Sequence, residues 1–327
     1  MNTTPFSGYF ADPFVISLAD GTYVAFGGSG APAVGERVFE SLASDDLVSW
    51  RPHGPVLKRL APSFGDEYWA PEVVEEGGRF WLFYSVGHGI VGHHLRVAMA
   101  DSALGPFEDQ DVNLTPRERF AIDPHPFLDV TGQWYLFFAR DVLEDERPGT
   151  HLAVMPLENM TSASAGPFAV LTPNADWQIY ERGRQMYGGV FDWYTLEGPS
   201  VVRRHGKYWL TFSGGAWTGP GYAVSWASAD APTGPWTHAP AGTPPLLFTS
   251  KSLIGPGHNS FVVSPSGDDI IVFHAWDEEL TVRRMHLHPV AFQPDGPRVD
   301  GPTRGPSELI QNRFGNEMHN GYLPNDA

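Results

Sequence analysis

The sequence predicts an all-β protein that folds as a single five-bladed β-propeller with four antiparallel strands in each blade. The first observation is a repeat, in which a glycine opens a strand rich in aromatic or β-branched residues: GTYVAFGG, GRFWLFYS, GQWYLFFA, GKYWLTFS and GDDIIVFH. The second is that these glycines are separated by 57, 54, 74 and 61 residues, a spacing that fits a four-stranded blade with its loops. The third is that helical periodicity is almost absent.

Each repeat begins with a short leading strand that enters a turn before the glycine. The five leading segments are ADPFVIS, WAPEVVE, IDPHPFLD, LEGPSVVRR and GHNSFVVS. Proline favours extended backbone in the residue before it, so extended conformations are expected at Asp12 and Asp123. A third strand follows the aromatic one, in RVFESLAS, HLRVAMAD, THLAVMPL, GYAVSWAS and VRRMHLHPVAF. Short strands with turn signals between them predict antiparallel sheets.

The repeats run from about residue 5 to about residue 295 without a linker. One domain over residues 1–327 is therefore expected, with a closing C-terminal segment at 296–327. The longest step between repeat glycines contains PNADWQIYERGRQMYGGVFDWYTLEGP, which is rich in aromatic residues but too polar for a core. It predicts a long loop on the face where the leading strands converge.

Composition and charge exclude several classes of function. With 38 Asp and Glu against 21 Lys and Arg, the net charge of −17 repels phosphate backbones and anionic lipid, so neither nucleic acid nor membrane is an expected partner. The absence of cysteine excludes disulfides, thiolate nucleophiles and Cys-based zinc sites. No signal-peptide pattern and no long apolar run are visible, which predicts a cytoplasmic protein. The oligomeric state is left open.

Counting nine residues back from each repeat glycine gives one candidate site residue in each repeat. They are Asp12, Trp69, Asp123, Glu197 and His258. A constant offset predicts equivalent places in five blades, so these side chains should converge on one axis. A single Asp-Pro pair is usually a turn or a cap. Three carboxylates in one place crowd negative charge, however, which costs free energy unless the site uses it.

Carboxylates in different environments of one cleft suit the hydrolysis of a glycosidic bond. One carboxyl must be protonated to donate to the leaving oxygen, and another must be ionised to activate water. A third carboxylate raises the pKa of the intended acid through its charge. An aromatic plane, such as that of Trp69, suits stacking against the C–H face of a sugar, although a tryptophan packed in the core is the alternative.

The motifs ADPF, WAPE, IDPHPF, LEGPS and GHNSF span residues 11 to 261, and together they resemble glycoside hydrolase family 43. This family contains arabinofuranosidases, xylosidases and arabinanases built on a five-bladed β-propeller. The resemblance implies that Asp12 is the general base, Glu197 the general acid, and Asp123 the carboxylate that tunes and orients the acid. It also implies that the single domain is catalytic and inverts anomeric configuration.

Further contacts with the sugar are expected around this trio. Phe14 belongs to the first motif, and His125 lies two residues after Asp123, so both are candidate substrate contacts. Arg283 resembles an arginine of the last blade that reaches the bound sugar in family members, although the adjacent Arg284 leaves the register open by one residue.

His258 resembles a central histidine that in the family often helps to hold a hydrated calcium or sodium ion in the axial channel. A buried histidine with one hydrogen bond is the alternative. No other oxygen-rich calcium motif is visible, so water would supply most of the ligands of such an ion. No cofactor is expected to be required for the chemistry.

The sequence therefore predicts an inverting exo-glycosidase acting on an oligosaccharide substrate. The expected product is a terminal pentose, α-L-arabinofuranose, released from arabino- or arabinoxylo-oligosaccharides. A β-D-xylosidase and an endo-1,5-α-arabinanase remain open, because family members with these activities share the same three carboxylates. A non-catalytic sugar-binding propeller is a further alternative, but such a protein has no need of a base, an acid and a tuning carboxylate together.

Overall fold

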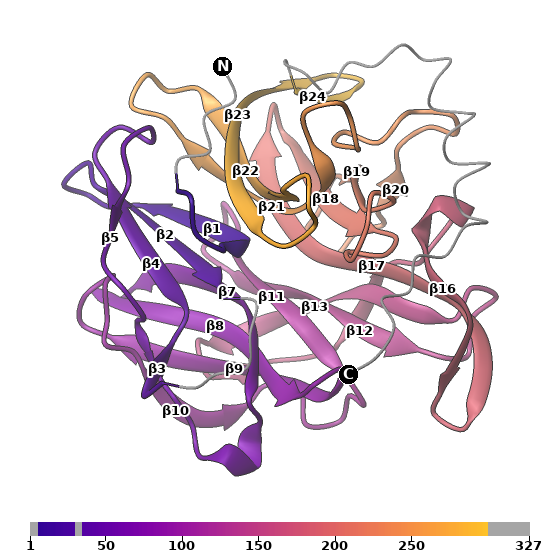
Figure 1. The fold of residues 1–327 in the computed structure, drawn as a ribbon, viewed down its shortest axis with the longest axis horizontal. Coiled ribbons are helices and arrows are strands. Elements are labelled where there is room, and N and C mark those ends of the chain that lie inside the picture. The colour runs from indigo at the N-terminus through magenta and orange to yellow at the C-terminus, as the bar shows by residue number, and fades with distance from the viewer. Residues whose placement is uncertain (1–5, 30–34, 300–327) are drawn as a thin grey trace.

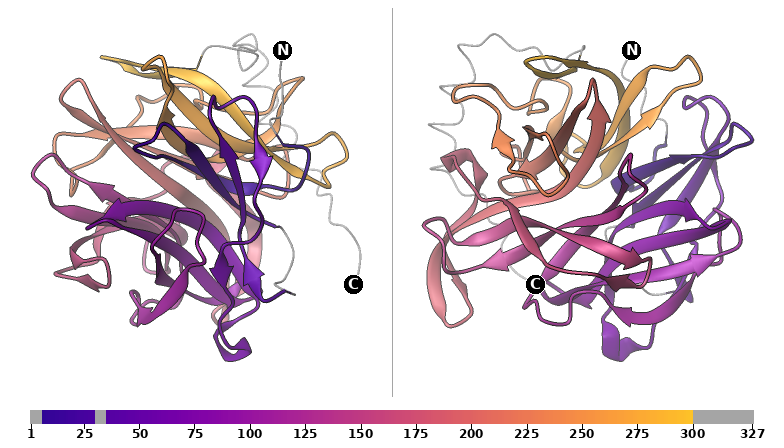
Figure 2. Two further views of the ribbon diagram at one scale, coloured as in Figure 1. Left: turned by 90° about the vertical axis from the view of Figure 1, so that its left-hand side faces the viewer. Right: turned by 180° about the vertical axis from the view of Figure 1, so that it is seen from behind.

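The computed structural model describes residues 6–29 and 35–299, and almost all the regular structure in this part is β-strand. Five inner strands group around the middle of the molecule, one from each blade (Figure 1): β1 (Ala11–Ser17), β7 (Glu67–Glu76), β11 (Ala121–Leu128), β17 (Gly189–Arg204) and β21 (Ile254–Val263). The blades follow one another around this axis in chain order (Figure 2). The predicted all-β, five-bladed propeller is confirmed.

Each inner strand is followed outward by three more strands of the same blade. The second strands are β2 (Tyr23–Gly28), β8 (Arg79–His88), β12 (Trp134–Val142), β18 (Lys207–Gly214) and β22 (Asp269–Trp276). The third strands are β4 (Glu40–Ser44), β9 (Val91–Ala100), β13 (Gly149–Asn159), β19 (Ala223–Ala229) and β23 (Arg283–Gln293). The outer strands are β5 (Arg51–Pro52), β10 (Glu108–Asn113), β15 (Phe168–Leu171), β20 (Thr237–His238) and β24 (Gly296–Val299).

The other elements are short or lie in connections. They are β3 (Arg37–Val38) paired with β6 (Leu57–Lys58), β14 (Ser162–Ala163), β16 (Ile179–Met186), and the 3₁₀ helices η1 (Pro62–Phe64) and η2 (Asp176–Gln178). Since β24 completes the fifth blade, that blade extends beyond residue 295, where the closing segment was expected to begin. Residues 300–327 of that segment lie outside the described residues. Nowhere in residues 6–29 and 35–299 is there a helix of the length and apolar character that a membrane crossing requires.

The core is divided into five apolar clusters, one at each interface between neighbouring blades. The interface of the fifth blade with the first contains Phe10, Val15, Val272 and Met285, all buried. Within residues 6–29 and 35–299, the first and the fifth blade are each built from strands that are close in the chain, and no strand pairing joins these two blades. Side-chain packing closes it instead, helped by bonds such as the Ser260 hydroxyl to the carbonyl of Pro13, at 2.8 Å.

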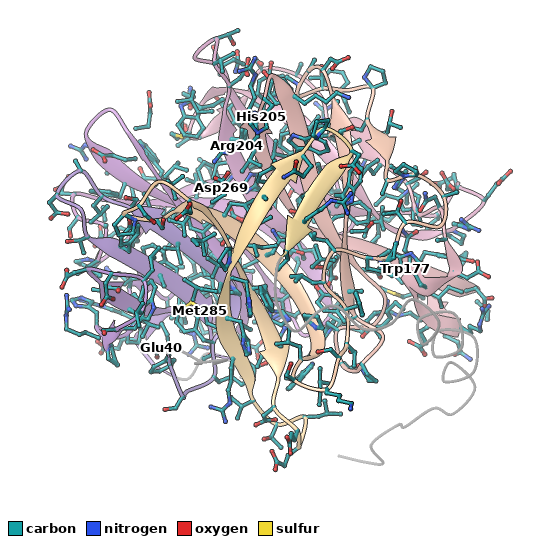
Figure 3. The ribbon with its side chains drawn as sticks, turned by 90° about the horizontal axis from the view of Figure 1, so that it is seen from above. Glu40, Trp177, Arg204, His205, Asp269 and Met285 are labelled. Atoms are coloured by element: carbon teal, nitrogen blue, oxygen red, sulfur yellow. The ribbon has the colours of Figure 1, made fainter. Side chains whose placement is uncertain are left out.

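A partly buried ion pair joins the fourth and fifth blades near the carboxyl ends of their inner strands. Arg204 of β17 and Asp269 beside it in β22 are labelled in Figure 3. The guanidinium donates from Nε and Nη2 to the two carboxylate oxygens at 2.9 and 2.5 Å. This bidentate geometry is the favourable one for an arginine and a carboxylate, so the pair fixes the two blades relative to each other.

The long insertion before Glu197, for which the sequence predicts a long loop, forms a β-hairpin instead. Strand β16 pairs with the first part of β17 down to a two-residue turn between Met186 and Gly189. Both turn residues, Tyr187 and Gly188, have positive φ angles of 52° and 79°, the pattern of a type I′ hairpin turn. Irregular pairing near Glu181 obscured the strand periodicity in the sequence.

Candidate active site

Every inner strand has a β-bulge near the point where the predicted site residues lie. The pairing register shifts after Ala11, Trp69, Ile122, Glu197 and Gly257. In each blade the next residue has a positive φ: 51° at Asp12, 51° at Ala70, 59° at Asp123, 55° at Gly198 and 48° at His258. The extended backbone expected at the two Asp-Pro pairs is therefore wrong, because the bulge requires a left-handed residue there.

The constant offset of nine residues hides a difference of one residue between blades. By register, Asp12, Asp123 and His258 occupy the left-handed position, whereas Trp69 and Glu197 occupy the position before it. The cause is the first turn of each blade, which has five residues in the first, third and fifth blades and two in the second and fourth. The predicted equivalence of all five residues is therefore wrong by one position.

Asp12 is a largely buried carboxylate, with its side chain 13% exposed, and it is surrounded by nitrogen atoms. Its Oδ1 lies 3.4 Å from Nη1 of Arg283, 3.4 Å from Nδ1 of His258 and 3.3 Å from Nδ1 of His274. Burial alone would raise the pKa of Asp12, but His258, Arg283 and the contact with His274 outweigh burial and hold it well below its ordinary value. Asp12 is therefore ionised at neutral pH.

His274 is a neutral partner of this carboxylate. Its Nδ1 accepts a hydrogen bond from the backbone N–H of Asp12 at 3.1 Å, which places the ring proton on Nε2. The ring is fully buried, and burial lowers the pKa of His274 to about 4 despite the nearby Asp12. The permanent positive charge beside Asp12 is consequently that of Arg283.

Glu197 is a partly buried carboxyl whose pKa is shifted in the opposite direction to that of Asp12. Burial raises the pKa of Glu197 to about 7, with a further contribution from the charge of Asp12, while a hydrogen bond from Tyr222 acts in the other direction. The Tyr222 hydroxyl donates to Oε1 of Glu197 at 2.6 Å. Since Oε1 accepts this bond, a proton on the neutral carboxyl is held on Oε2.

Tyr222 is itself held firmly. Its ring lies parallel to that of His274, with centroids 5.8 Å apart, and the side chain is almost fully buried. Gly257 permits this packing, because a Cβ at that position would lie 1.8 Å from Cε1 of Tyr222. The stack connects the surroundings of Glu197 with those of Asp12.

Asp123 lies beside both other carboxylates and is fixed through the backbone of β17. Its Oδ2 accepts a hydrogen bond from the N–H of Gly198, directly after Glu197, at 2.8 Å, and lies 3.9 Å from Nδ1 of His258. Burial, followed by the charges of Glu197 and Asp12, raises the pKa of Asp123 well above its ordinary value. The three carboxylates that the sequence predicts to converge therefore lie in one site.

Arg283, not Arg284, points into the site. Besides approaching Asp12, its Nε donates to the hydroxyl of Tyr9 at 2.6 Å, and its guanidinium lies 4.6 Å from the ring centroid of Trp217. Arg284 instead forms an ion pair with Asp277, with 3.6 Å between Nη2 and Oδ2. The aromatic surroundings exclude water around Arg283 and hold its charge in place.

Trp69 and Glu197 line the same small cavity. The Trp69 indole stacks on the ring of His93 at 3.7 Å between centroids, and its Nε1 donates to Oε2 of Glu67 at 3.2 Å. One face of the indole is thus covered by protein, and the ring is fixed at the edge of the cavity. This position is compatible with the predicted role as a platform for sugar.

Two of the predicted substrate contacts lie elsewhere. Phe14 lines a cavity of about 370 Å³ at the carboxyl ends of the inner strands, to which none of the three carboxylates contributes. His125 is buried, with Nδ1 bound to Oε2 of Glu72 at 2.8 Å and Nε2 accepting from the N–H of Val201 at 2.9 Å. Both ring nitrogens are used, so His125 connects blades and has no free atom for a sugar.

His258 lies between two of the carboxylates rather than in a set of metal ligands. Its backbone N–H donates to the hydroxyl of Ser213 at 2.7 Å, and its Nδ1 faces Asp12 and Asp123. Across residues 6–29 and 35–299, no group of three or more His, Asp or Glu side chains is arranged to hold a metal ion. The donor set therefore fits only an ion bound mainly by water, and no chemical step depends on one.

Four residues of the site were not predicted from the sequence patterns: Tyr222, His274, Tyr9 and Trp217. His274 had a signal, since a histidine at the end of the apolar strand GDDIIVFH has few reasons to be there. Tyr222 and Trp217 had none, because they lie in turns of the fourth blade and reach Glu197 and Arg283 only through the folding of the chain.

The comparisons with known proteins agree with this geometry. The sequence pattern of glycosyl hydrolases family 43 matches residues 3–297. The beta-D-galactofuranosidase xynD of Aspergillus niger is 29% identical over 287 residues, which cover 82% of this chain and 74% of that protein. An extracellular exo-alpha-(1->5)-L-arabinofuranosidase of Streptomyces avermitilis is 26% identical over 287 residues, which cover 83% of this chain and 56% of that protein. The chain thus spans little more than half of the Streptomyces enzyme.

Solved structures give the same result. A thermostable family-43 glycoside hydrolase matches with a TM-score of 0.78 and 27% identity, over 94% of this chain and 98% of that one. An endo-1,4-beta-xylanase from Bacteroides thetaiotaomicron matches with a TM-score of 0.73 and 28% identity, over 92% of this chain and 97% of that one. Three carboxylates near the axis of a five-bladed propeller, and a family pattern that covers nearly the whole chain, lead to one conclusion: the chain belongs to glycosyl hydrolase family 43 and is a glycoside hydrolase.

Proposed function

We propose that this enzyme is an inverting exo-glycosidase that releases terminal α-L-arabinofuranose from arabino- or arabinoxylo-oligosaccharides. The proposed mechanism rests on one observation: the pKa values of two carboxyls in one site are shifted in opposite directions. The pKa of Glu197 is raised to about 7, so it is substantially protonated at neutral pH, whereas the pKa of Asp12 is well below its ordinary value. Such a pair supplies an acid and a base at the same pH.

In the proposed reaction Glu197 donates the proton on Oε2 to the glycosidic oxygen, and that bond breaks. Asp12 accepts a proton from a water molecule, whose oxygen forms the new bond to the anomeric carbon from the opposite face. Asp123 positions the acid through the N–H of Gly198, while burial and the negative charge of Asp12 keep the acid protonated. Arg283 holds Asp12 in its ionised form.

The choice of sugar rests on the relatives. Three of those described as exo-alpha-(1->5)-L-arabinofuranosidases come from Streptomyces avermitilis, Streptomyces chartreusis and Cellvibrio japonicus. The Aspergillus niger relative is named for galactofuranose, which shares the five-membered ring, so a furanose site is the common feature. A β-D-xylosidase is the second candidate, since a relative from Xylanibacter ruminicola carries that name.

Exo attack is supported by the relatives that are named exo-alpha-(1->5)-L-arabinofuranosidases. The hairpin of β16 and β17 narrows the site beside the acid, because its residues Tyr180, Arg184 and Trp193 line the small cavity that Glu197 also lines. An endo-acting enzyme needs an open groove that a chain can cross on both sides of the cleaved bond, so a narrow site is consistent with attack at a chain end.

A hydrated calcium or sodium ion near His258 remains part of the proposal. The ring nitrogen that faces Asp12 and Asp123 is occupied by these carboxylates, so the ion would have to be held by the other side of the imidazole and by water. Its effect would be on the position of His258, with no role in the transfer of protons.

The test is turnover on 4-nitrophenyl α-L-arabinofuranoside, β-D-xylopyranoside and β-D-galactofuranoside, compared at equal enzyme concentration. The expected result is the highest kcat/KM on the arabinofuranoside. A clear preference for the xylopyranoside would contradict the choice of sugar, and no turnover of any of the three would contradict the proposed function.

Tyr222→Phe is expected to move the basic limb of the pH profile of kcat/KM to higher pH. The Tyr222 hydroxyl donates to Oε1 of Glu197, which stabilises the ionised carboxylate and lowers its pKa. Without that bond the pKa of Glu197 rises, and the acid stays protonated to higher pH. A limb that stays in place, or moves to lower pH, in a folded variant would show that Tyr222 does not position the acid.

A further inference from the structure

The small cavity beside Glu197 has polar groups that the reaction itself does not use. Its volume is about 60 Å³, enough for the edge of one sugar ring but not for a chain. Glu197 lines it, whereas neither Asp12 nor Asp123 does. Among the remaining lining residues are Asp141 and Thr150 of the third blade and Arg184 of the hairpin.

Asp141 is a fourth carboxylate near the site, and it connects the hairpin with the third blade. Its Oδ1 accepts from the hydroxyl of Thr150 at 3.0 Å, and its Oδ2 accepts from the hydroxyl of Tyr187, at the hairpin tip, at 2.7 Å. Each carboxylate oxygen can accept a second hydrogen bond, so acceptor capacity remains at the cavity wall.

Arg184 is a largely buried cation with unused donors. Its side chain is 13% exposed, and its guanidinium lies 4.8 Å from the ring centroid of Tyr180 and 5.2 Å from that of Trp193. Its Nε is 3.6 Å from Oε2 of Glu181. In the described part of the chain, its two terminal nitrogens donate no hydrogen bond. A guanidinium held by aromatic rings, with free donors facing a cavity, is arranged to bind a polar ligand.

The cavity is lined by the acid Glu197 and not by the base Asp12, and this indicates which part of the substrate binds in it. In an inverting hydrolysis the base and its water act on one face of the sugar, and the acid protonates the departing oxygen on the other. We propose that Arg184 and Asp141 bind the hydroxyls of the leaving-group sugar, the unit released from the anomeric carbon when the bond breaks. This inference rests on the proposed function, and it assigns the hairpin the recognition of a neutral sugar ring.

The chemistry of the wall fits such a ligand. Sugar hydroxyls donate and accept, so they can pair with the Asp141 carboxylate and the Arg184 guanidinium together. The hydrogen bond from Tyr187 keeps the hairpin tip against the third blade, and thereby keeps Arg184 at the cavity. A leaving group without hydroxyls, such as nitrophenol, cannot make these bonds.

The test compares Arg184→Met with Arg182→Met. Methionine keeps the apolar packing between Tyr180 and Trp193 while removing the charge. Arg182 is the matched control, because it lies on the same strand and pairs with Asp192 at 2.8 Å but does not line the cavity, and its side chain is 53% exposed. Each variant is assayed on the 4-nitrophenyl glycoside that the wild type cleaves best and on a disaccharide or trisaccharide of the same terminal sugar.

Arg184→Met is expected to lower kcat/KM on the oligosaccharide by about 10- to 100-fold, mainly through KM, because a hydrogen bond to a charged group is lost. On the nitrophenyl glycoside the change should stay below about threefold, and Arg182→Met should change neither substrate. Equal losses on both substrates would place Arg184 at the cleaved sugar and overturn the proposal, as would no loss on either. Both outcomes leave the proposed function standing, whereas a wild type that cleaves none of these substrates contradicts that function.

A second variant covers the case in which Arg184→Met unfolds. Asp141→Asn keeps the shape of the side chain, and the same selective loss on the oligosaccharide is expected. Calorimetric titration in the Glu197→Gln background supplies a readout without turnover: the oligosaccharide should bind more weakly when Arg184→Met is added, and the methyl glycoside of the terminal sugar should not. Unchanged oligosaccharide affinity in that comparison would overturn the proposal.

Discussion

Asp12→Asn is expected to reduce kcat by about 10²- to 10⁴-fold on every substrate, whatever its leaving group. The reason is that attack by water needs a base in all cases, and Asn cannot accept the proton. The ionised state of Asp12 is favoured by His258 and Arg283, each with a nitrogen 3.4 Å from its Oδ1. Binding of the sugar should persist, because the surrounding side chains and the N–H bond to His274 are retained.

The measurement is steady-state kinetics of Asp12→Asn on a nitrophenyl glycoside and on an oligosaccharide, with binding followed by calorimetry. A circular dichroism spectrum and melting temperature near those of the wild type serve as the control for folding. Near-normal turnover, or a loss confined to substrates with poor leaving groups, would contradict the role of Asp12 as the base.

Glu197→Gln is expected to reduce kcat/KM by about 10²- to 10⁴-fold on oligosaccharides, but far less on dinitrophenyl glycosides. Glutamine cannot protonate the departing oxygen, and a sugar alkoxide leaves poorly without a proton. A dinitrophenolate is a stable anion and needs no such help. The contrast between the two substrates, measured on one preparation, is the signature of a general acid, and an equal loss on both would remove Glu197 from that role.

The same residue predicts the shape of the pH profile. The pKa of Glu197 is raised to about 7, so the protonated acid is present below that pH and is lost above it. The kcat/KM of the wild type on an oligosaccharide should therefore fall as the pH rises through about 7. In Glu197→Gln, assayed on the dinitrophenyl glycoside, this basic limb should be absent. A limb that persists there would belong to another group.

Much of the fold could be predicted, because each blade repeats its own local signals. A glycine before an aromatic strand marks the first hairpin of a blade, and five such signals give five blades. The strand register at the site was harder to predict from the sequence. It depends on whether the first turn has two or five residues, as at Gly77 and Gly78 compared with residues 18–22. The repeat glycine is the last residue of the two-residue turn but the fourth residue of the five-residue turn, as at Gly78 and Gly21. This difference in turn length caused the error of one position in the predicted equivalence of the five site residues.

The site residues could be predicted where the chemistry requires a charged group beside a turn, as at Asp12, Asp123 and Glu197. Residues that reach the site from other turns and hairpins could not. Tyr222 reaches Glu197, and Arg184 reaches the cavity, only through the way strands pair and hairpins fold. His125 shows the converse, since its position after Asp123 suggested a substrate contact, yet the alternation of side chains after the bulge directs it to Glu72.

The stereochemistry of the first product distinguishes a base that acts through water from a carboxylate that attacks the sugar. If Asp12 activates water while Glu197 protonates the leaving group, the released sugar must have the anomeric configuration opposite to that of the substrate. Proton NMR during the first turnovers on an arabino-oligosaccharide, before mutarotation equilibrates the anomers, distinguishes the two outcomes. With Asp12 as base and Glu197 as acid, the expected initial product is free arabinose with inverted configuration. Retained configuration would mean that a carboxylate attacks the sugar itself, and would contradict the assignment of Asp12 as a base acting through water.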